Sequence, residues 1–154
     1  MVRTIPVADG PVAPWLDRLI AATTAACGVG CIVLLLRATP DPRGYNTHVA
    51  LPLGIPPCGW PLRYGIPCPT CGVTTAACEV VHGHLLQAFV VQPFGALLAL
   101  AGIAATVISV ACLCRGRSTM DLVARLPYGS LLLAGLGLLL GSWLYKYLTF
   151  VPPP

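Results

Sequence analysis

Three apolar stretches dominate this sequence, and each is long enough to cross a lipid bilayer. They cover about residues 17–37, 93–114 and 128–150. About 20 consecutive apolar residues span the hydrocarbon core, so each stretch predicts a transmembrane helix. Charged residues make up only 9% of the 154-residue chain, and soluble domains carry about 25%. We therefore predict an all-α integral membrane protein, a small helical bundle forming one domain.

Two further segments lie between the first and second spans. Residues 38–69 are rich in proline, which excludes a regular helix. Irregular backbone is not tolerated against lipid, so this connection is predicted to be an extramembrane loop. Residues 71–91 predict a helix, but Glu79, His82 and His84 make it a poor free-standing span. We expect this fourth helix to be amphipathic or re-entrant, lying shallow against the three spans.

The densest concentration of unusual chemistry opens this fourth helix. It reads Pro67-Cys68-Pro69-Thr70-Cys71-Gly72-Val73-Thr74-Thr75-Ala76, with Gly83-His84 and Gln92-Pro93 further along. Over roughly residues 56–100 the pattern resembles the bacterial family called domain of unknown function 2752. Members are similar in a Cys-Pro-x-Cys-Gly-x-Thr-Arg-Ala core, a Gly followed by an acid, and an Asn-Pro. This chain differs by having Thr75, His84 and Gln92 in place of Arg, the acid and Asn. The resemblance implies a structural motif that includes Pro67, Gly72, Thr74, Gly83 and Pro93, and it implies no activity.

The C-x-x-C pair, Cys68 and Cys71, is the first candidate for chemistry. A helix N-terminus stabilises a thiolate and lowers the pKa of its thiol. Such a pair can exchange thiols and disulfides as a catalytic pair, or share a metal ion. The alternative is that both cysteines brace the turn between loop and helix, with or without a static disulfide. The residues alone leave these interpretations open.

A stripe of polar side chains continues from this pair along the helix. At 100° per residue, Cys71, Thr75, Cys78 and His82 share one face. Cys71 and Cys78 are about 10 Å apart along the axis, too far for one zinc ion with Zn–S bonds of about 2.3 Å. Cys78 and His82 can form half a metal site, with loop partners such as Cys58 or His48. The favoured interpretation is a polar stripe that faces the other helices. No cofactor is predicted, with zinc or a disulfide as the alternatives.

Other small residues are interpreted mainly as packing residues. Cys27 and Cys31 are expected to pack within the first span, and Cys112 and Cys114 to pack at the end of the second, where acylation is the alternative. Gly137 and Gly141 form a G-x-x-x-G pattern in the third span, typical of helix contacts in self-association or with other membrane subunits.

Basic residues give the predicted orientation. Five arginines belong to the side of the N-terminus and of the short polar loop expected over residues 115–125; the other side has Arg37, Arg43, Arg63 and Lys146. The excess favours a cytoplasmic N-terminus and an external loop 38–69. With the resemblance above, the predicted location is the bacterial inner membrane, with the lipid bilayer as partner. The basic residues are scattered and not interleaved with aromatics, so nucleic-acid binding is not predicted.

Two classes of function remain after these observations. The favoured one is a small non-enzymatic multi-pass membrane protein, an accessory or scaffold component of a membrane assembly. The alternative is a membrane thiol–disulfide oxidoreductase or metal-binding protein that uses Cys68 and Cys71, with Cys58 as a shuttle. No phosphate-binding loop, dinucleotide fingerprint or metalloprotease motif occurs. Whether the protein is an enzyme stays open, with a non-enzymatic role preferred.

Overall fold

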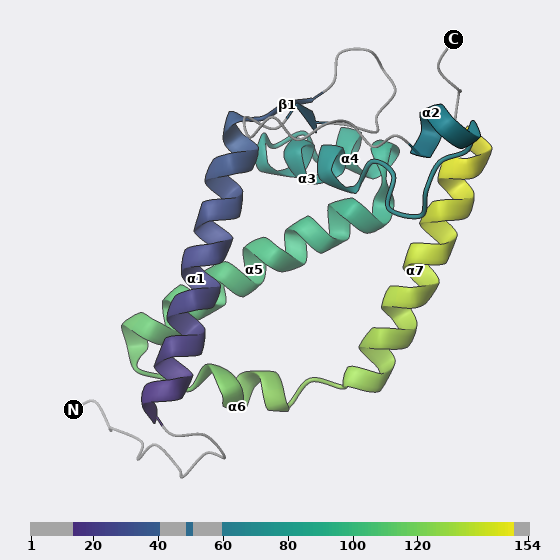
Figure 1. The fold of residues 1–154 in the computed structure, drawn as a ribbon. Helices are drawn as coiled ribbons and strands as arrows, with labels where there is room; N and C mark the ends of the chain where they lie inside the picture. The colour runs from purple at the N-terminus through teal and green to yellow at the C-terminus, as the bar shows by residue number, and fades with distance from the viewer. Residues whose placement is uncertain (1–13, 41–48, 51–59, 150–154) are drawn as a thin grey trace.

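Three long helices form the frame of the protein. The computed structural model describes residues 14–40, 49–50 and 60–149. Helices α1 (Pro14–Arg37), α5 (Pro93–Arg115) and α7 (Tyr128–Thr149) are each long and apolar enough to cross a membrane. Figure 1 shows α1 and α7 on the two sides, with α5 running obliquely between them. The predicted all-α fold with three spanning helices is confirmed.

The short elements gather at the two ends of this frame. Helices α2 (Trp60–Tyr64), α3 (Val73–Val81) and α4 (Leu85–Val91) lie at the end where α1 and α7 finish and α5 begins (Figure 1). Strands β1 (Thr39–Pro40) and β2 (Val49–Ala50) pair there antiparallel, with Thr39 opposite Ala50. Helix α6 (Thr119–Ala124) lies at the opposite end. Thus α3 and α4 pack across the ends of the long helices and do not run beside them as a fourth span.

The prediction of a single helix over residues 71–91 is wrong, because the structure has two helices there, α3 and α4. Helix α3 ends in a Schellman motif: Gly83 N–H donates to the Val80 carbonyl at 3.0 Å and His84 N–H to the Glu79 carbonyl at 2.8 Å. This closure requires a left-handed residue, and Gly83 has φ of +84°. The glycine therefore ends α3 and lets α4 start in a new direction.

Two segments predicted as irregular contain short helices. Residues 115–125, predicted to be a polar loop, hold α6, and the proline-rich connection 38–69 holds α2. In α2 the proline follows Trp60 directly, in the first turn, where a helix does not need its N–H. The first N–H groups of α6 are capped by a residue of another helix. The Asp17 carboxylate of α1 accepts from Thr119 N–H at 3.2 Å and from Met120 N–H at 2.9 Å.

The apolar core lies where α3 and α4 pack on the first turns of α5. Its buried members are small or β-branched, namely Ala76, Val80, Ala88, Val91 and Ala96. Small side chains let helix backbones approach closely, which is how helices associate where lipid leaves little hydrophobic driving force. Most large apolar side chains of the three long helices are instead exposed, as expected for surfaces that face lipid.

Helices α3 and α5 approach each other closely at Gly95. A Cβ atom added at Gly95 would lie 2.7 Å from the Val73 Cα and 3.0 Å from the Val73 carbonyl oxygen. These are backbone atoms at the start of α3, so they cannot move aside as a flexible side chain would. Gly95 thus fixes how the start of α3, and the cysteine pair before it, sits on α5.

We predict that Gly95→Ala lowers the unfolding temperature of the detergent-solubilised protein, because the added methyl group forces α3 and α5 apart. Overpacking of this kind costs about 1–3 kcal/mol. Gly102→Ala is the matched control, since a Cβ there meets nothing within 4 Å and Ala has the better helix propensity. Thermal unfolding followed by tryptophan fluorescence measures both; equal unfolding temperatures for the two variants would contradict the assigned contact.

Candidate thiol site

The two cysteines of the C-x-x-C sequence sit on one tight turn before α3. Cys71 N–H donates to the Cys68 carbonyl at 3.0 Å, which closes an i to i+3 turn. Such a turn brings its end Cα atoms within about 7 Å, the range that a disulfide can bridge. Gly72, with φ of +88°, then redirects the chain into α3. The backbone therefore holds the Cα atoms of the two cysteines at a separation that permits a disulfide.

The two thiols have different surroundings. Cys68 is half-buried, and its sulfur lies 3.6 Å from the Thr70 hydroxyl. Cys71 is only 3% exposed. Burial raises the pKa of the Cys71 thiol to about 12, the neighbouring Cys68 adds to the rise, and the positive charge of Lys146 opposes it. Cys68 is thus the thiol that an external reactant can reach, and Cys71 is the protected one.

The end of α7 forms one wall of the site. Trp143 donates from its indole N–H to the Pro67 carbonyl at 3.1 Å, directly before Cys68. One helical turn of α7 also reaches the joint between α4 and α5: Lys146 Nζ donates to the Val91 carbonyl at 3.3 Å, and the Ser142 hydroxyl accepts from Phe94 N–H at 3.0 Å. Ser142 and Lys146 are the buried residues of α7.

These bonds exist because the joint between α4 and α5 leaves backbone groups free. Pro93 opens α5 and has no N–H to donate, so the helix cannot run continuously from α4. The last carbonyls of a helix have no partner within it. Tyr145 O–H donates to the Val90 carbonyl at 2.9 Å, and Lys146 Nζ donates to the Val91 carbonyl. The third span, α7, is therefore held by hydrogen bonds to the backbone groups that the break at Pro93 leaves free between α4 and α5.

Buried polar atoms without partners lie close to this joint. Gln92 is fully buried, and its amide donates to the Pro69 carbonyl between the two cysteines at 3.5 Å. Within the described residues, Gln92 Oε1 and the Thr75 hydroxyl have no hydrogen-bond partner. Lys146, 6% exposed, makes its one hydrogen bond to a carbonyl. The inner side of the cysteine turn thus faces unusually polar surroundings for the end of a membrane helix.

Cys78 and His82, the second pair of candidate metal ligands, lie in different surroundings from the cysteine turn. Cys78 is buried, and its thiol lies 3.5 and 3.4 Å from the Leu35 and Ala38 carbonyls at the end of α1. His82 is exposed on the next turn, with Nδ1 3.6 Å from the Cys78 sulfur. Burial raises the pKa of the Cys78 thiol, and Glu79 adds to the rise. A raised pKa opposes the thiolate form that binds metal.

The residues that the structure describes contain no group of three His, Cys, Asp or Glu side chains placed to hold a metal ion. Cys68, Cys71, Cys78 and His82 are therefore not brought together as one ligand set. The proposed loop partners Cys58 and His48 lie outside the described residues.

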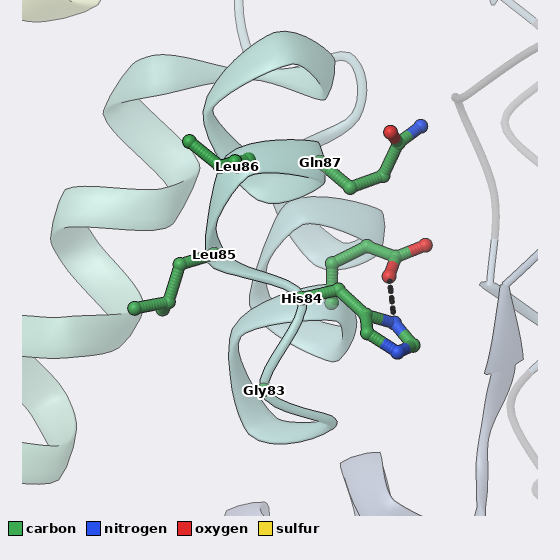
Figure 2. A pocket seen from close by; sticks show the side chains of 6 residues that line it. Gly83, His84, Leu85, Leu86 and Gln87 are labelled. Atoms are coloured by element: carbon green, nitrogen blue, oxygen red, sulfur yellow. Dashed lines mark hydrogen bonds and ion pairs between the residues drawn. The ribbon is translucent and has the colours of Figure 1, made fainter.

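Glu79 and His84 form a separate feature beside α4. The Glu79 carboxylate, 8% exposed as a residue, pairs with Nδ1 of His84 at 2.9 Å. Glu79 and His84 both line an open hollow. Figure 2 shows the side chains of His84 and Gln87 on one side of the chain, with Leu85 and Leu86 pointing the other way. The pairing explains how a carboxylate is kept within this short helix, as a charge at membrane depth needs a partner.

The remaining predicted positions are not part of the thiol site. Thr74 is exposed, whereas Pro67 is buried beneath Trp143. Cys27, Cys31 and Cys114 are exposed and Cys112 is partly exposed, so packing within the chain does not account for the cysteines of the long helices. A Cβ added at Gly137 or Gly141 would meet no atom of the described residues within 4 Å.

The sequence interpretation missed Gln92, Ser142 and Lys146 as site residues. It counted Lys146 only among the basic residues that give the orientation, and it noted Gln92 only as a departure from a family pattern. A signal was present, because an ionisable residue inside an apolar span points to a function by default. Ser142 and Lys146 are also four residues apart, which puts them on one helix face.

Comparison with known proteins confirms the family resemblance. Residues 58–106 match DUF2752, described as a protein of unknown function. The matched segment runs from the connection before the cysteine turn through α3, α4 and the first half of α5. No curated protein and no solved structure matches the chain. The DUF2752 segment thus includes Cys68, Cys71 and Gln92, while the α7 residues that bond to their chain neighbours, Trp143 and Lys146, lie outside it.

We predict that iodoacetamide at pH 8 modifies Cys68 well before Cys71 in the reduced protein. Only about one part in ten thousand of a thiol with a pKa near 12 is thiolate at this pH, and thiolate is the reactive form. Burial of Cys71 adds a steric barrier. Peptide mass mapping after timed quenching measures both rates, and comparable rates would contradict the assigned difference between the two thiols.

Proposed function

We propose that this protein is a membrane thiol–disulfide exchange protein. Cys68 forms the mixed disulfide with the substrate, and Cys71 is the resolving cysteine, which forms or releases the Cys68–Cys71 disulfide. One observation supports this above all: an accessible and a buried cysteine share a turn whose geometry suits a disulfide. A purely bracing role does not require this difference in access. The described residues also give no metal ligand set that would employ the pair otherwise.

The proposed exchange moves two electrons. A thiolate of a substrate dithiol attacks the Cys68 sulfur of the Cys68–Cys71 disulfide, so a substrate–Cys68 bond forms and the Cys68–Cys71 bond breaks. The electron pair of the broken bond leaves on the Cys71 sulfur. The second substrate thiolate then attacks the substrate sulfur bound to Cys68, which releases Cys68 as a thiolate. The substrate dithiol is oxidised to a disulfide and the cysteine pair is reduced; the reverse sequence reduces a substrate disulfide.

The proposed location supports such chemistry. We place the protein in the bacterial inner membrane with its N-terminus in the cytoplasm. Arg18, Arg115, Arg117 and Arg125 belong to the α6 end of the frame, consistent with the positive-inside rule. The cysteine turn lies at the opposite end (Figure 1). That end then faces the oxidising periplasm, where disulfides persist.

We predict that Cys71→Ser traps a mixed disulfide between Cys68 and a substrate protein in cells, because Cys68 can still attack a substrate disulfide and no Cys71 thiol remains to release the substrate. Cys68→Ser should trap none, since Cys71 is buried. Cys114→Ser is the control for an exposed cysteine outside the site. Non-reducing electrophoresis with mass identification of the trapped partner is the measurement. Absence of any specific adduct with Cys71→Ser, while the protein is inserted normally, would reject the exchange function.

A second candidate is the accessory or scaffold role, and the free part of α7 favours it. From Tyr128 to Gly141 this helix has no buried residue, and its buried residues begin at Ser142. We propose that Gly137 and Gly141 form a close helix contact with a second copy of this chain. Small residues four apart permit such contacts between membrane helices.

For this candidate we predict that Gly137→Leu reduces self-association in a bilayer, because the larger side chain holds the facing helices apart. Gly102→Leu on α5 is the matched control, as a Cβ there is equally unobstructed by the residues that the structure describes. Energy transfer between donor- and acceptor-labelled copies in vesicles measures the association. Equal transfer for wild type and Gly137→Leu would exclude this face as the contact.

A further inference from the structure

The most unusual charged group of the described chain is the ammonium of Lys146. It lies in a membrane-spanning helix and is 6% exposed, yet its one hydrogen bond to a described residue is to the Val91 carbonyl. In the part of the chain that the structure describes, no carboxylate forms an ion pair with it. Taking a charge out of water costs several kcal/mol unless an opposite charge compensates. A single carbonyl is weak compensation.

Cys71 is the neighbouring group that can carry the missing opposite charge. Among the described residues, the charged or titratable groups that act on the Cys71 thiol are Cys68, on its own turn, and Lys146, from α7. The backbone contacts place both on one side of the joint: Lys146 binds the carbonyl of Val91, and the next residue, Gln92, binds the carbonyl of Pro69 inside the cysteine turn. The turn and the lysine thus meet across the α4–α5 joint.

We propose that Lys146 is the counter-charge of the Cys71 thiolate, which it stabilises as the leaving group when the Cys68–Cys71 disulfide is opened. The inference rests on the proposed exchange function. When an incoming thiolate bonds to Cys68, the electron pair of the old S–S bond comes to rest on the Cys71 sulfur beside the ammonium. A thiol leaves faster when its thiolate is better stabilised. Because Cys71 is buried, water cannot supply that stabilisation.

This role accounts for a lysine at a place where an apolar residue would pack at lower cost. With the disulfide closed, the site has one positive charge with no paired carboxylate among the described residues, and as the disulfide opens the ammonium faces the departing Cys71 thiolate. The charge therefore stabilises the open, reactive arrangement more than the resting one. Tyr145 performs the same backbone task at Val90 with a neutral hydroxyl, so capping a free carbonyl does not require a cation.

The test compares Lys146→Met with wild type in the full-length protein in lipid nanodiscs, after oxidation of the pair. Reduction by dithiothreitol, quenched and mapped by mass, gives the opening rate of the Cys68–Cys71 disulfide. Lys146→Met is expected to slow it by about threefold or more, because an opposite charge nearby is lost in a low-dielectric site. Tyr145→Phe, which removes a neighbouring carbonyl contact but no charge, is expected to react at the wild-type rate.

A second measurement separates this inference from the function it rests on. In the Cys68→Ser background no disulfide of the pair can form, and the alkylation rate of Cys71 by iodoacetamide at pH 9 reports its thiolate fraction. Lys146→Met should lower this rate by about threefold or more, and Lys146→Arg should stay within about twofold of the lysine protein. An Arg variant as slow as Met, or a Met variant as fast as Lys, would overturn the role of the charge.

The two proposals can therefore be refuted independently of each other. If the wild-type cysteine pair forms no disulfide or does not exchange, the proposed function is refuted. The alkylation rates would still decide whether Lys146 pairs with Cys71. A purely structural role for Lys146 predicts a lower unfolding temperature for Lys146→Met with unchanged thiol rates. The counter-charge role predicts slower thiol rates for Lys146→Met whatever its unfolding temperature, because this variant also loses the donor to the Val91 carbonyl.

Discussion

The free backbone carbonyls at the α4–α5 joint are the constraint on which this architecture depends. A membrane-embedded chain must satisfy every backbone polar group internally, because lipid offers no hydrogen bonds. The break at Pro93 leaves Val90 and Val91 with free carbonyls, and Tyr145 and Lys146 of α7 supply the donors. The same turn of α7 thereby comes to lie against the cysteine turn. A local break in one helix thus positions another helix and the candidate site together.

The long helices could be predicted from sequence because lipid makes their requirement simple. An uninterrupted apolar run of sufficient length predicts a span whatever its neighbours are, and α1, α5 and α7 follow the predicted boundaries closely. The single helix over residues 71–91 could not be predicted correctly by periodicity. Its polar stripe continued at 100° per residue through Gly83, and only the left-handed conformation of that glycine ends α3 there.

The candidate site shows the same division between local and long-range information. The Cys68–Cys71 pair and its place before a helix are local features, readable directly. Lys146 is 75 residues further along the chain than Cys71, and its position near the end of a span is typical of lysines that extend toward the interface. Burial of this lysine depends on how α7 packs against the α4–α5 joint, which no local pattern encodes.

The exchange and scaffold roles use different parts of α7 and can coexist in one molecule. Gly137 precedes Lys146 by nine residues, about 13 Å along the helix axis. A second helix on the Gly137–Gly141 face would lie along the free half of α7, whereas Trp143 and Lys146 keep the other end against the cysteine turn. Because Lys146 is anchored to the α4–α5 joint, association through α7 would leave the thiol environment unchanged. Cys68 would then remain accessible within an assembly, and the assembly would fix the position of the thiol pair at the membrane surface.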